Sequence, residues 1–286
     1  MTFAEHAALP PVSADAPPRS RGLVGRASGT VLDFARESSA VADVELRKIF
    51  RDPTELLTRA VQPTLWLLVF GQVFTRTRAI PTGKLSYLEF MAPGVLAQSV
   101  LFSAIFYGIA IIWERDLGIV HKMLVSPASR GALVFGKAIS AGLRALSQAV
   151  IIILLSLVLG VRLRLDPVSL IGVAIVVVLG AALFSTFSFV IACLVKTRER
   201  FMGIGQVLTM PLFFASNAIY PIAMMPEWLR VVARVNPLTY LVNALRELMV
   251  QGGQSTVGLP TDFLVLTLAC LVMVILAARL YPGIVR

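Results

Sequence analysis

Charged residues are scarce in this sequence. They make up 15% of its 286 residues, whereas 57% are hydrophobic. A soluble domain carries about a quarter of its residues as charges, so this balance and a mean hydropathy of +0.82 exclude a soluble globular protein. Cysteine is scarce as well. Cys193 and Cys270 both lie inside apolar runs, where they behave as small apolar residues, so no disulfide framework is implied.

The residue combinations that most enzymes use are also missing. The histidines are His6, in the N-terminal region, and His121, in a polar stretch. No paired carboxylates face an apolar run and no Ser, His and Asp set has a plausible placement, so we predict no catalytic and no metal site. Residues 131–138, GALVFGKA, match a phosphate-loop spacing, but Ala138 replaces the Ser or Thr that holds magnesium. The stretch also opens an apolar helix, so any nucleotide chemistry must belong to another chain.

Acidic residues are missing from the middle of the apolar runs. Ion-coupled transport usually needs a membrane-embedded carboxylate that carries a proton or a sodium ion. The 16 acidic residues fall in the N-terminal region, in loops or at the ends of runs, and those that come closest are Glu89, Glu114, Asp166, Glu199 and Asp262. This argues against a proton-driven antiporter, although a carboxylate at the end of a run can still titrate.

What the chain has in abundance is long apolar sequence. Each run reaches about 20 residues, which as a helix crosses roughly 30 Å of hydrocarbon. Lipid cannot satisfy open backbone groups and no alternating barrel pattern occurs, so we predict an all-α, polytopic integral membrane protein with six transmembrane helices. Pro211 and Pro221 interrupt the fifth run. The runs cover about residues 57–75, 93–113, 131–161, 167–195, 201–223 and 261–281.

Basic residues outnumber acidic ones, 26 to 16, and their positions indicate topology rather than binding to nucleic acid. With six spans and a cytoplasmic N-terminus, 16 basic residues lie on the cytoplasmic side, 8 lie on the other face, and Arg59 and Arg144 fall within spans. This asymmetry follows the positive-inside rule and predicts that both termini are cytoplasmic. The expected location is the cytoplasmic (inner) membrane, crossed several times.

Three regions are predicted along the chain. Residues 1–28 are rich in Pro, Ala, Ser and Arg without an apolar core of signal-peptide length, so they are expected to form a disordered cytoplasmic tail. Residues 29–52 place most of their apolar side chains on one helical arc, which predicts an amphipathic helix lying flat at the inner interface. An ordinary helix facing water is the alternative. Residues 53–286 are expected to form the six-helix transmembrane domain.

A proline-containing segment precedes the last run. We predict two short helices there, at 226–235 and 237–250, with Asn236 placed to cap the second. Because both mix apolar and charged residues, they are expected to be re-entrant or interfacial helices at the outer face. Breaks between helices can serve a gate, with solvation at the membrane surface as the alternative. The candidate outer-gate residues are Pro226, Asn236, Pro237, Arg246 and Glu247, of which the last two can pair across a dimer or with headgroups.

A polar island, WERDLGIVHKMLVSPASRG at residues 113–131, separates the second run from the third. Leu117, Val120 and Leu124 recur at helical spacing, so we predict a short helix over 114–128 with one apolar edge. Such an edge can lie in a groove of a partner protein while the charges set its orientation. The alternative is a solvated loop that obeys the positive-inside rule, which explains the basic residues but not the apolar edge.

Aromatic side chains concentrate in the first, second and fifth runs. Pairs one helical turn apart, and a group beside the prolines of the fifth run, give apolar walls with a few polar groups, which suit an amphiphilic drug or lipid. Ordinary helix packing is the alternative for each of them. The candidate substrate-pathway residues are Trp66, Phe70, Phe102, Phe106, Phe213, Phe214, Asn217 and Tyr220.

Three stretches carry a resemblance to a known family. They are ERDLGIVHKMLVSPASRGALVFGKAIS at 114–140, YPIAMMPEWLR at 220–230 and NPLTYLVNALRELM at 236–249. Together, in this order, they resemble the type 2 ABC transporter permeases, especially the daunorubicin-resistance and multidrug efflux branch. The likeness in layout covers about residues 31–286. It implies six helices per subunit, a cytoplasmic coupling helix over 114–128, and a permease dimer with two separate ATPase subunits. The residues implied to couple to the ATPase are Glu114, Arg115, Asp116, Leu117, Val120, His121 and Leu124.

The expected function is therefore that of the transmembrane permease subunit of an ATP-driven exporter. It would move a drug-like, lipid or glycolipid or polysaccharide substrate out across the membrane, along a route between permease subunits. The expected partners are separate ABC ATPase subunits, a second permease subunit in a homodimer or heterodimer, membrane lipid, and an amphiphilic or lipid-linked substrate. The chain itself is expected to be no enzyme and to bind no cofactor, with ATP and magnesium on the partner ATPase. An ion-coupled secondary transporter and an ATP-independent membrane assembly factor are the alternatives.

Overall fold

The computed structural model describes residues 58, 61–77, 80–116, 130–195 and 197–280, without the side chains of residues 106–108, 110, 111, 114–116 and 130–140. Over these residues the elements are helical, apart from one isolated antiparallel bridge between Leu163 and Val250. The all-α prediction is therefore confirmed. The predicted tail at 1–28 and interface helix at 29–52 lie outside the described residues.

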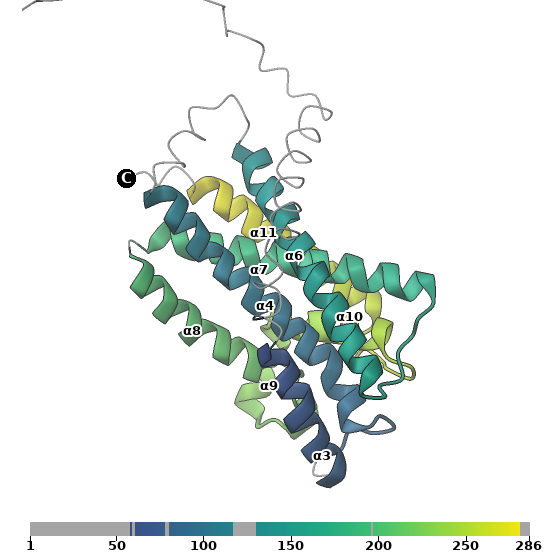
Figure 1. Cartoon of the computed structure of the whole chain (residues 1–286). Coiled ribbons are helices and arrows are strands. Elements are labelled where there is room, and N and C mark those ends of the chain that lie inside the picture. The colour runs from purple at the N-terminus through teal and green to yellow at the C-terminus, as the bar shows by residue number, and fades with distance from the viewer. Residues whose placement is uncertain (1–57, 59–60, 78–79, 117–129, 196, 281–286) are drawn as a thin grey trace, which may run out of the picture.

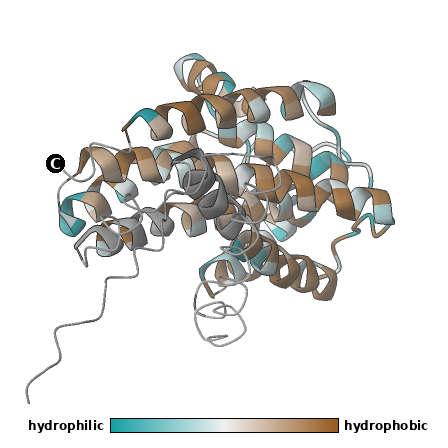
Figure 2. Cartoon of the chain, turned by 90° about the horizontal axis from the view of Figure 1, so that it is seen from above, coloured by the Kyte–Doolittle hydropathy of each residue, from teal (hydrophilic) through white to brown (hydrophobic). Residues whose placement is uncertain are grey.

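Four helices in the described part of the chain are long and apolar enough to cross a membrane. They are α4 (Tyr87–Asp116), α6 (Arg130–Val158), α7 (Pro167–Leu194) and α11 (Leu259–Leu280). Hydrophobic residues colour most of the helical ribbon, and hydrophilic ones gather mainly at helix ends and loops (Figure 2). Such surfaces suit a hydrocarbon surrounding, because helices satisfy their own backbone groups. Four of the six predicted spans have this support, and the count of six stays a prediction.

The two remaining apolar runs form shorter helical segments. The first segment, residues 61–77, is helical throughout and contains a π-helix, η1 (Trp66–Gly71), followed by α3 (Gln72–Thr77). The fifth run forms α8 (Arg198–Phe214), which has 17 residues. Pro211 lies inside α8, and the helix ends three residues after it. The proline lacks an N–H and its ring crowds the preceding turn, so it weakens the last turns of α8.

Helix α4 forms the centre of the assembly. Almost all of Tyr87–Ile105 is buried, and α4 packs against α6, α7, α8, α10 (Pro237–Met249) and η1. Figure 1 shows it crossing the assembly diagonally, with α8 along one side. Helix α11, in contrast, buries only three of its residues, Asp262, Leu266 and Ala277. Its outward apolar side chains at helical spacing are suited to lipid or to a partner subunit. They include Leu264, Leu268, Leu271, Val272 and Ile275.

Helix α7 begins at a polar cap that fits its sequence. The Asp166 carboxylate accepts a hydrogen bond from the Ser169 backbone N–H at 2.9 Å, and Pro167 occupies the first helical position. Asp and Pro are the residue types favoured at these two positions. The backbone hydrogen bond from Ser169 also holds the pKa of the Asp166 carboxyl below its usual value. Because α7 contacts α4, α6, α10 and α11, this cap fixes the start of a helix on which several others pack.

Two short helices precede α11, as predicted: α9 (Glu227–Val235) and α10, after a 3-10 turn η2 (Ile222–Met224). Their bounds agree with the expected 226–235 and 237–250. Most of α10 is buried against α4, α7 and α11, whereas α9 exposes Trp228 and Val235. The interior position of α10 is what a re-entrant helix requires, while its place relative to a membrane stays a prediction.

Candidate functional site

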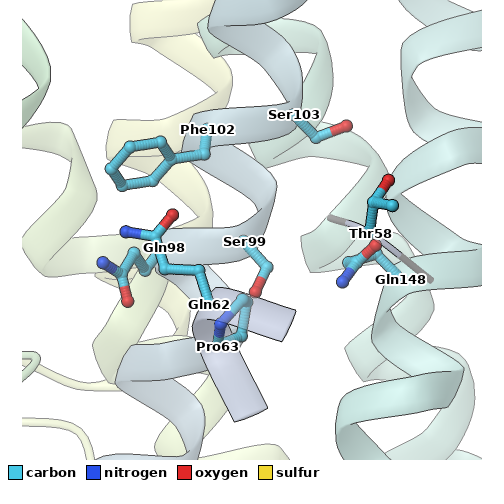
Figure 3. A pocket seen from close by; sticks show the side chains of 8 residues that line it. All are labelled: Thr58, Gln62, Pro63, Gln98, Ser99, Phe102, Ser103 and Gln148. Atoms are coloured by element: carbon cyan, nitrogen blue, oxygen red, sulfur yellow. The ribbon is translucent and has the colours of Figure 1, made fainter. Parts of the chain in front are cut away.

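Two adjoining cavities lie beside α4. The first, of about 230 Å³, is enclosed by the first segment, α4 and α6. Figure 3 shows Gln62, Gln98 and Phe102 on one side of this space and Thr58 and Gln148 on the other. We call it the amide cavity, because three of its lining residues are glutamines. Its lining residues are Thr58, Gln62, Pro63, Gln98, Ser99, Phe102, Ser103 and Gln148.

The second cavity, of about 260 Å³, lies between the first segment, α4 and α8. Gln62 and Phe102 line both spaces, so these two side chains stand between the cavities. We call the second space the apolar cavity, because hydrophobic side chains dominate its wall. Its lining residues are Gln62, Phe102, Ile105, Ile109, Phe201, Met202, Gly205, Gln206, Thr209 and Met210.

The amide cavity lies about halfway along the helices that form it. Gln98 follows Tyr87, the start of α4, by about 16 Å of helix, and Gln148 precedes Val158, the end of α6, by about 15 Å, at 1.5 Å per residue. These two helix ends lie on the same side, because the loop that follows α6 bonds to the first turn of α4. Half of a hydrocarbon layer of roughly 30 Å is a similar depth. Both amides therefore lie near the middle of any membrane that α4 and α6 span.

Two of these amides are almost completely buried and only partly satisfied. Gln98 is 2% exposed and Gln148 is 3% exposed. Over the described residues, Gln98 Oε1 and Gln148 Nε2 have no hydrogen-bond partner. An amide atom buried without a partner is unfavourable and therefore rare, so each occurrence needs an explanation. No charged side chain is among the described residues that line either cavity.

The Glu89 carboxylate fixes the start of α4. Its Oε2 accepts a hydrogen bond from the Ser86 backbone N–H at 2.8 Å, while the Glu89 N–H donates to Ser86 Oγ at 3.2 Å. This reciprocal pair is a capping box, and the sequence Ser-Tyr-Leu-Glu has the required spacing. The other oxygen, Oε1, accepts from Arg162 Nε at 2.8 Å. That bond raises the pKa of the Arg162 guanidinium.

The loop after α6 continues this connection to the end of α10. The Arg164 N–H donates to the Met249 carbonyl and the Gln251 N–H donates to the Arg162 carbonyl, each at 2.9 Å. The Gln251 side chain also donates to the Leu163 carbonyl at 2.9 Å. The start of α4, the α6–α7 loop and the end of α10 are thus bonded together. We call this end of the molecule, at residues 86–89, 160–166 and 249–256, the bonded end.

A buried polar cluster lies near the bonded end, between α10 and the turn after α8. Asn217 Nδ2 donates to Asn243 Oδ1 at 2.5 Å, and Asn243 Nδ2 donates to Thr256 Oγ1 at 2.8 Å. Arg246 Nη2 donates to the Asn217 carbonyl at 2.7 Å and to the Phe90 carbonyl at 3.3 Å. The guanidinium also lies 3.9 Å from the centre of the Phe90 ring. These contacts explain how a charged residue is tolerated inside the helix bundle.

Comparison of the sequence with known proteins identifies the family of this chain. The family described as ABC-2 type transporter matches residues 36–250, which include the first segment, both cavities and α10. The chain belongs to the ABC-2 type transporter family. It is 30% identical to the ycf38 transport permease of Cyanophora paradoxa over 68% of each chain. It is 25% identical to the daunorubicin resistance ABC transporter permease protein DrrB1 of Streptomyces coeruleorubidus, over 69% of each chain. Similarity extends to the inner membrane transport permease YadH of Escherichia coli, at 23% identity over 67% of this chain and 73% of the relative.

The aromatic residues predicted to line a substrate pathway in this ABC-2 permease divide into two groups. Phe102 lines both cavities, and Phe106 lies in α4 with its side chain outside the described set. The others pack on one another. Trp66 stacks on Phe70 with ring centres 4.5 Å apart and meets Phe213 edge to face at 6.0 Å. This column joins the first segment to α8, as the packing alternative expects, and its role in transport stays a prediction.

Phe214, Asn217 and Tyr220 also lie away from the two cavities. Phe214 contacts Phe213 with ring centres 5.6 Å apart, and the Tyr220 hydroxyl donates to the Phe214 carbonyl at 2.6 Å. Asn217 is 1% exposed and belongs to the buried polar cluster. These three side chains therefore stabilise the turn between α8 and α9 in the described structure.

The candidate gate residues of the permease occupy the junction of α9 and α10 and the polar cluster. Asn236 caps α10 as predicted, since its Oδ1 accepts from the Leu238 N–H at 3.0 Å, and Pro237 takes the first helical position. The pairing of Arg246 across a dimer or with headgroups stays a prediction, and the described contacts of Arg246 lie within its own subunit. Arg246 is 4% exposed, because carbonyls and a ring of its own subunit surround it. Glu247 accepts from the Ser255 N–H at 3.0 Å, and Pro226 precedes the first residue of α9.

The residues expected to couple to an ATPase lie at the end of α4 or outside the described residues. Glu114, Arg115 and Asp116 form the last residues of α4, and their side chains are not described. Leu117, Val120, His121 and Leu124 lie outside the described residues. In the described part of α4, Trp113 has its ring centre 4.2 Å from the Arg198 guanidinium. This contact joins the last turns of α4 to the start of α8.

The cavity glutamines of the permease are not among the site residues predicted from the sequence. Gln62, Gln98, Gln148 and Gln206 each fall inside one of the predicted apolar runs, the first, second, third and fifth. All four line one or both cavities. Polar side chains inside membrane spans usually face the bundle interior and mark functional positions. The signal that marks them in the sequence is a neutral amide inside an otherwise apolar run, which acidic and aromatic residues alone do not reveal.

Proposed function

We propose that this ABC-2 permease is the transmembrane subunit of an ATP-driven exporter in the cytoplasmic membrane. Separate ATPase subunits supply the energy, and a second permease subunit completes the pathway. The observation that carries the proposal is the pair of cavities at mid-depth in a chain of this family. Polar pockets among spanning helices are the usual location of transported ligands. The transported class is an amphiphile, such as a drug-like, lipid or glycolipid molecule.

Helices α4 and α6 connect the proposed ATPase-docking segment to the amide cavity. Both helices line the amide cavity near their midpoints. Both also contribute an end to the polar island at residues 113–131, at which an ATPase is proposed to dock. The bonded end holds the opposite ends of these helices together through Glu89 and Arg162. A pull on the island therefore tilts α4 and α6 about the bonded end and changes the width of the cavity between them.

The ion-coupled alternative finds little support in the cavity. None of the described lining residues carries a carboxylate. The buried carboxylate of Asp262 lies instead in the neighbourhood of the polar cluster, where Ser255 Oγ donates to its Oδ2 at 2.6 Å. A carboxylate placed away from the cargo can couple to it only through a further conformational step. We therefore favour ATP as the energy source.

The docking part of the proposal is tested by a double substitution in the island. Leu117→Asp with Val120→Asp places two charges on the predicted apolar edge. We expect the ATPase subunits that co-purify with the parent permease to be lost, and ATP-dependent export with them, while membrane insertion stays normal. Val257→Asp is the matched control, because Val257 is exposed near the bonded end, away from the island. Co-purification and export equal to those of the parent would remove the island from the coupling mechanism.

A further inference from the structure

The amide cavity suggests the chemical class of the cargo. We propose that it binds the headgroup of an uncharged amphiphile that both donates and accepts hydrogen bonds, such as a hydroxyl or amide group, and that it disfavours cations. This inference rests on the proposed function for the ligand's role as cargo. The binding itself needs neither ATP nor a partner subunit.

The unpartnered amide atoms define the hydrogen-bonding complement of the ligand. Gln98 Oε1 is an acceptor that needs a donor, and Gln148 Nε2 is a donor that needs an acceptor. Both side chains are at least 97% buried, so bulk water reaches them poorly. A headgroup that carries donors and acceptors satisfies both, whereas a quaternary ammonium or a hydrocarbon satisfies neither.

The lack of charge in the wall decides against an ionic headgroup. None of the described lining residues of the amide cavity is charged, and it lies at mid-depth of the spanning helices. A charged ligand there would lose its hydration without gaining an opposite charge. Arg144 precedes Gln148 by one turn of α6 and is not among the lining residues.

The neighbouring apolar cavity accounts for the rest of the ligand. It adjoins the amide cavity at Gln62 and Phe102, and its wall includes Ile105, Phe201 and Met210. A headgroup held by Gln98 and Gln148 can thus extend an alkyl chain past Phe102 against apolar side chains. Two cavities of similar size and different polarity fit an amphiphile better than a uniformly polar or apolar molecule.

Binding of matched probes to the purified full-length permease in lipid nanodiscs tests the proposal. The radiolabelled probes share an eight-carbon chain: N-octanoyl-N-methylglucamine, octyl methyl ether, octyltrimethylammonium and octyl sulfate. Equilibrium dialysis against empty nanodiscs gives the protein-dependent binding. We expect the neutral glucamine amide to bind most tightly. Gln98→Leu or Gln148→Leu should each weaken its binding up to about tenfold, since each removes one hydrogen-bonding group at similar side-chain size.

Ser156→Ala is the matched control for these variants. Ser156 is a buried residue of α6 whose hydroxyl donates to the Ile152 carbonyl of its own helix, and it does not line the cavity. Its variant should bind the glucamine amide like the parent. Equal binding of the ether or the ammonium probe, or glucamine binding unchanged by both glutamine substitutions, would overturn the assignment.

A labelling experiment keeps the proposal testable if a glutamine variant fails to fold. Ser103→Cys places a thiol in the cavity wall, in a background with Cys193→Ala and Cys270→Ala. The glucamine amide should slow its reaction with N-ethylmaleimide, and octyltrimethylammonium should not. Equal protection by both probes, or by neither, would contradict the inference. Selective neutral binding without ATP-driven transport would refute the proposed function alone, and ATP-driven transport that prefers the cation would refute this inference alone.

Discussion

At the scale of single residues, Glu89 shows how one buried carboxylate serves two parts of the chain. Its side chain is 4% exposed, whereas that of Arg162 is 67% exposed. Glu89 closes the capping box of α4 and also accepts the hydrogen bond from Arg162. In the sequence, Glu89 is one of the acidic residues that come closest to the position of an ion-carrying carboxylate in a membrane span. Its contacts make it a structural group of the bonded end.

Substitutions at this pair should therefore have unequal effects. Glu89→Ala removes the cap and leaves the Ser86 N–H without its acceptor, so we expect it to lower the free energy of unfolding by about 1–3 kcal/mol. Arg162→Ala should lower it by less, since an exposed charge is screened by water. Chemical denaturation of the two variants and of the double variant in detergent measures both effects and their coupling. An Arg162→Ala effect as large as that of Glu89→Ala would contradict this division.

At the scale of secondary-structure elements, α10 depends on contacts at both of its ends. Asn236 caps its start and also donates from Nδ2 to the Leu212 carbonyl of α8 at 2.7 Å. Its last turn carries Arg246, which reaches the Phe90 carbonyl of α4. A short helix with so many polar contacts needs them in the bundle interior, because polar groups buried there without partners are costly.

Asn236 separates the capping contact from the contact with α8. Asn236→Asp keeps an acceptor for the Leu238 N–H but loses the donor to Leu212, whereas Asn236→Ala loses both. We expect the Ala variant to lose about 1–2 kcal/mol of unfolding free energy. The Asp variant should lose less, because it keeps the cap. Chemical denaturation of the purified variants in detergent, compared by midpoint and by denaturant slope, measures the difference. An Ala variant as stable as the parent would show that α10 needs neither contact.

Most of the helices are predictable from the sequence, and the differences between predicted and observed positions have physical causes. The cap at Asn236 and Pro237 and the length of α6 follow from local sequence. The second apolar run begins at about residue 93, whereas the helix that contains it begins at Tyr87. The capping box Ser86-x-x-Glu89 carried the correct start. The interior position of Arg246 was not predictable in this way, since its acceptors at Asn217 and Phe90 are 29 and 156 residues away in sequence.

At the scale of the whole molecule, the two ends of the bundle differ. The bonded end joins α4, the α6–α7 loop and α10 through hydrogen bonds and an ion pair. At the opposite end, α4 and α8 meet where Arg198 lies over Trp113, beside the polar island. The cavities lie between these ends, along α4. A lever fixed at one end and moved at the other is the simplest account of how ATPase docking changes the cavities.

Uptake by inside-out vesicles tests the central claim most directly. The vesicles contain the permease together with its co-purifying ATPase subunits, and uptake of the neutral, cationic and anionic eight-carbon amphiphiles is measured with and without ATP and magnesium. We predict accumulation of at least one amphiphile that requires ATP hydrolysis. We also predict its loss in Ser103→Trp, which fills the amide cavity while the ATPase subunits remain bound. Accumulation driven by an ion gradient without ATP, or ATP-driven accumulation unchanged by Ser103→Trp, would contradict the account.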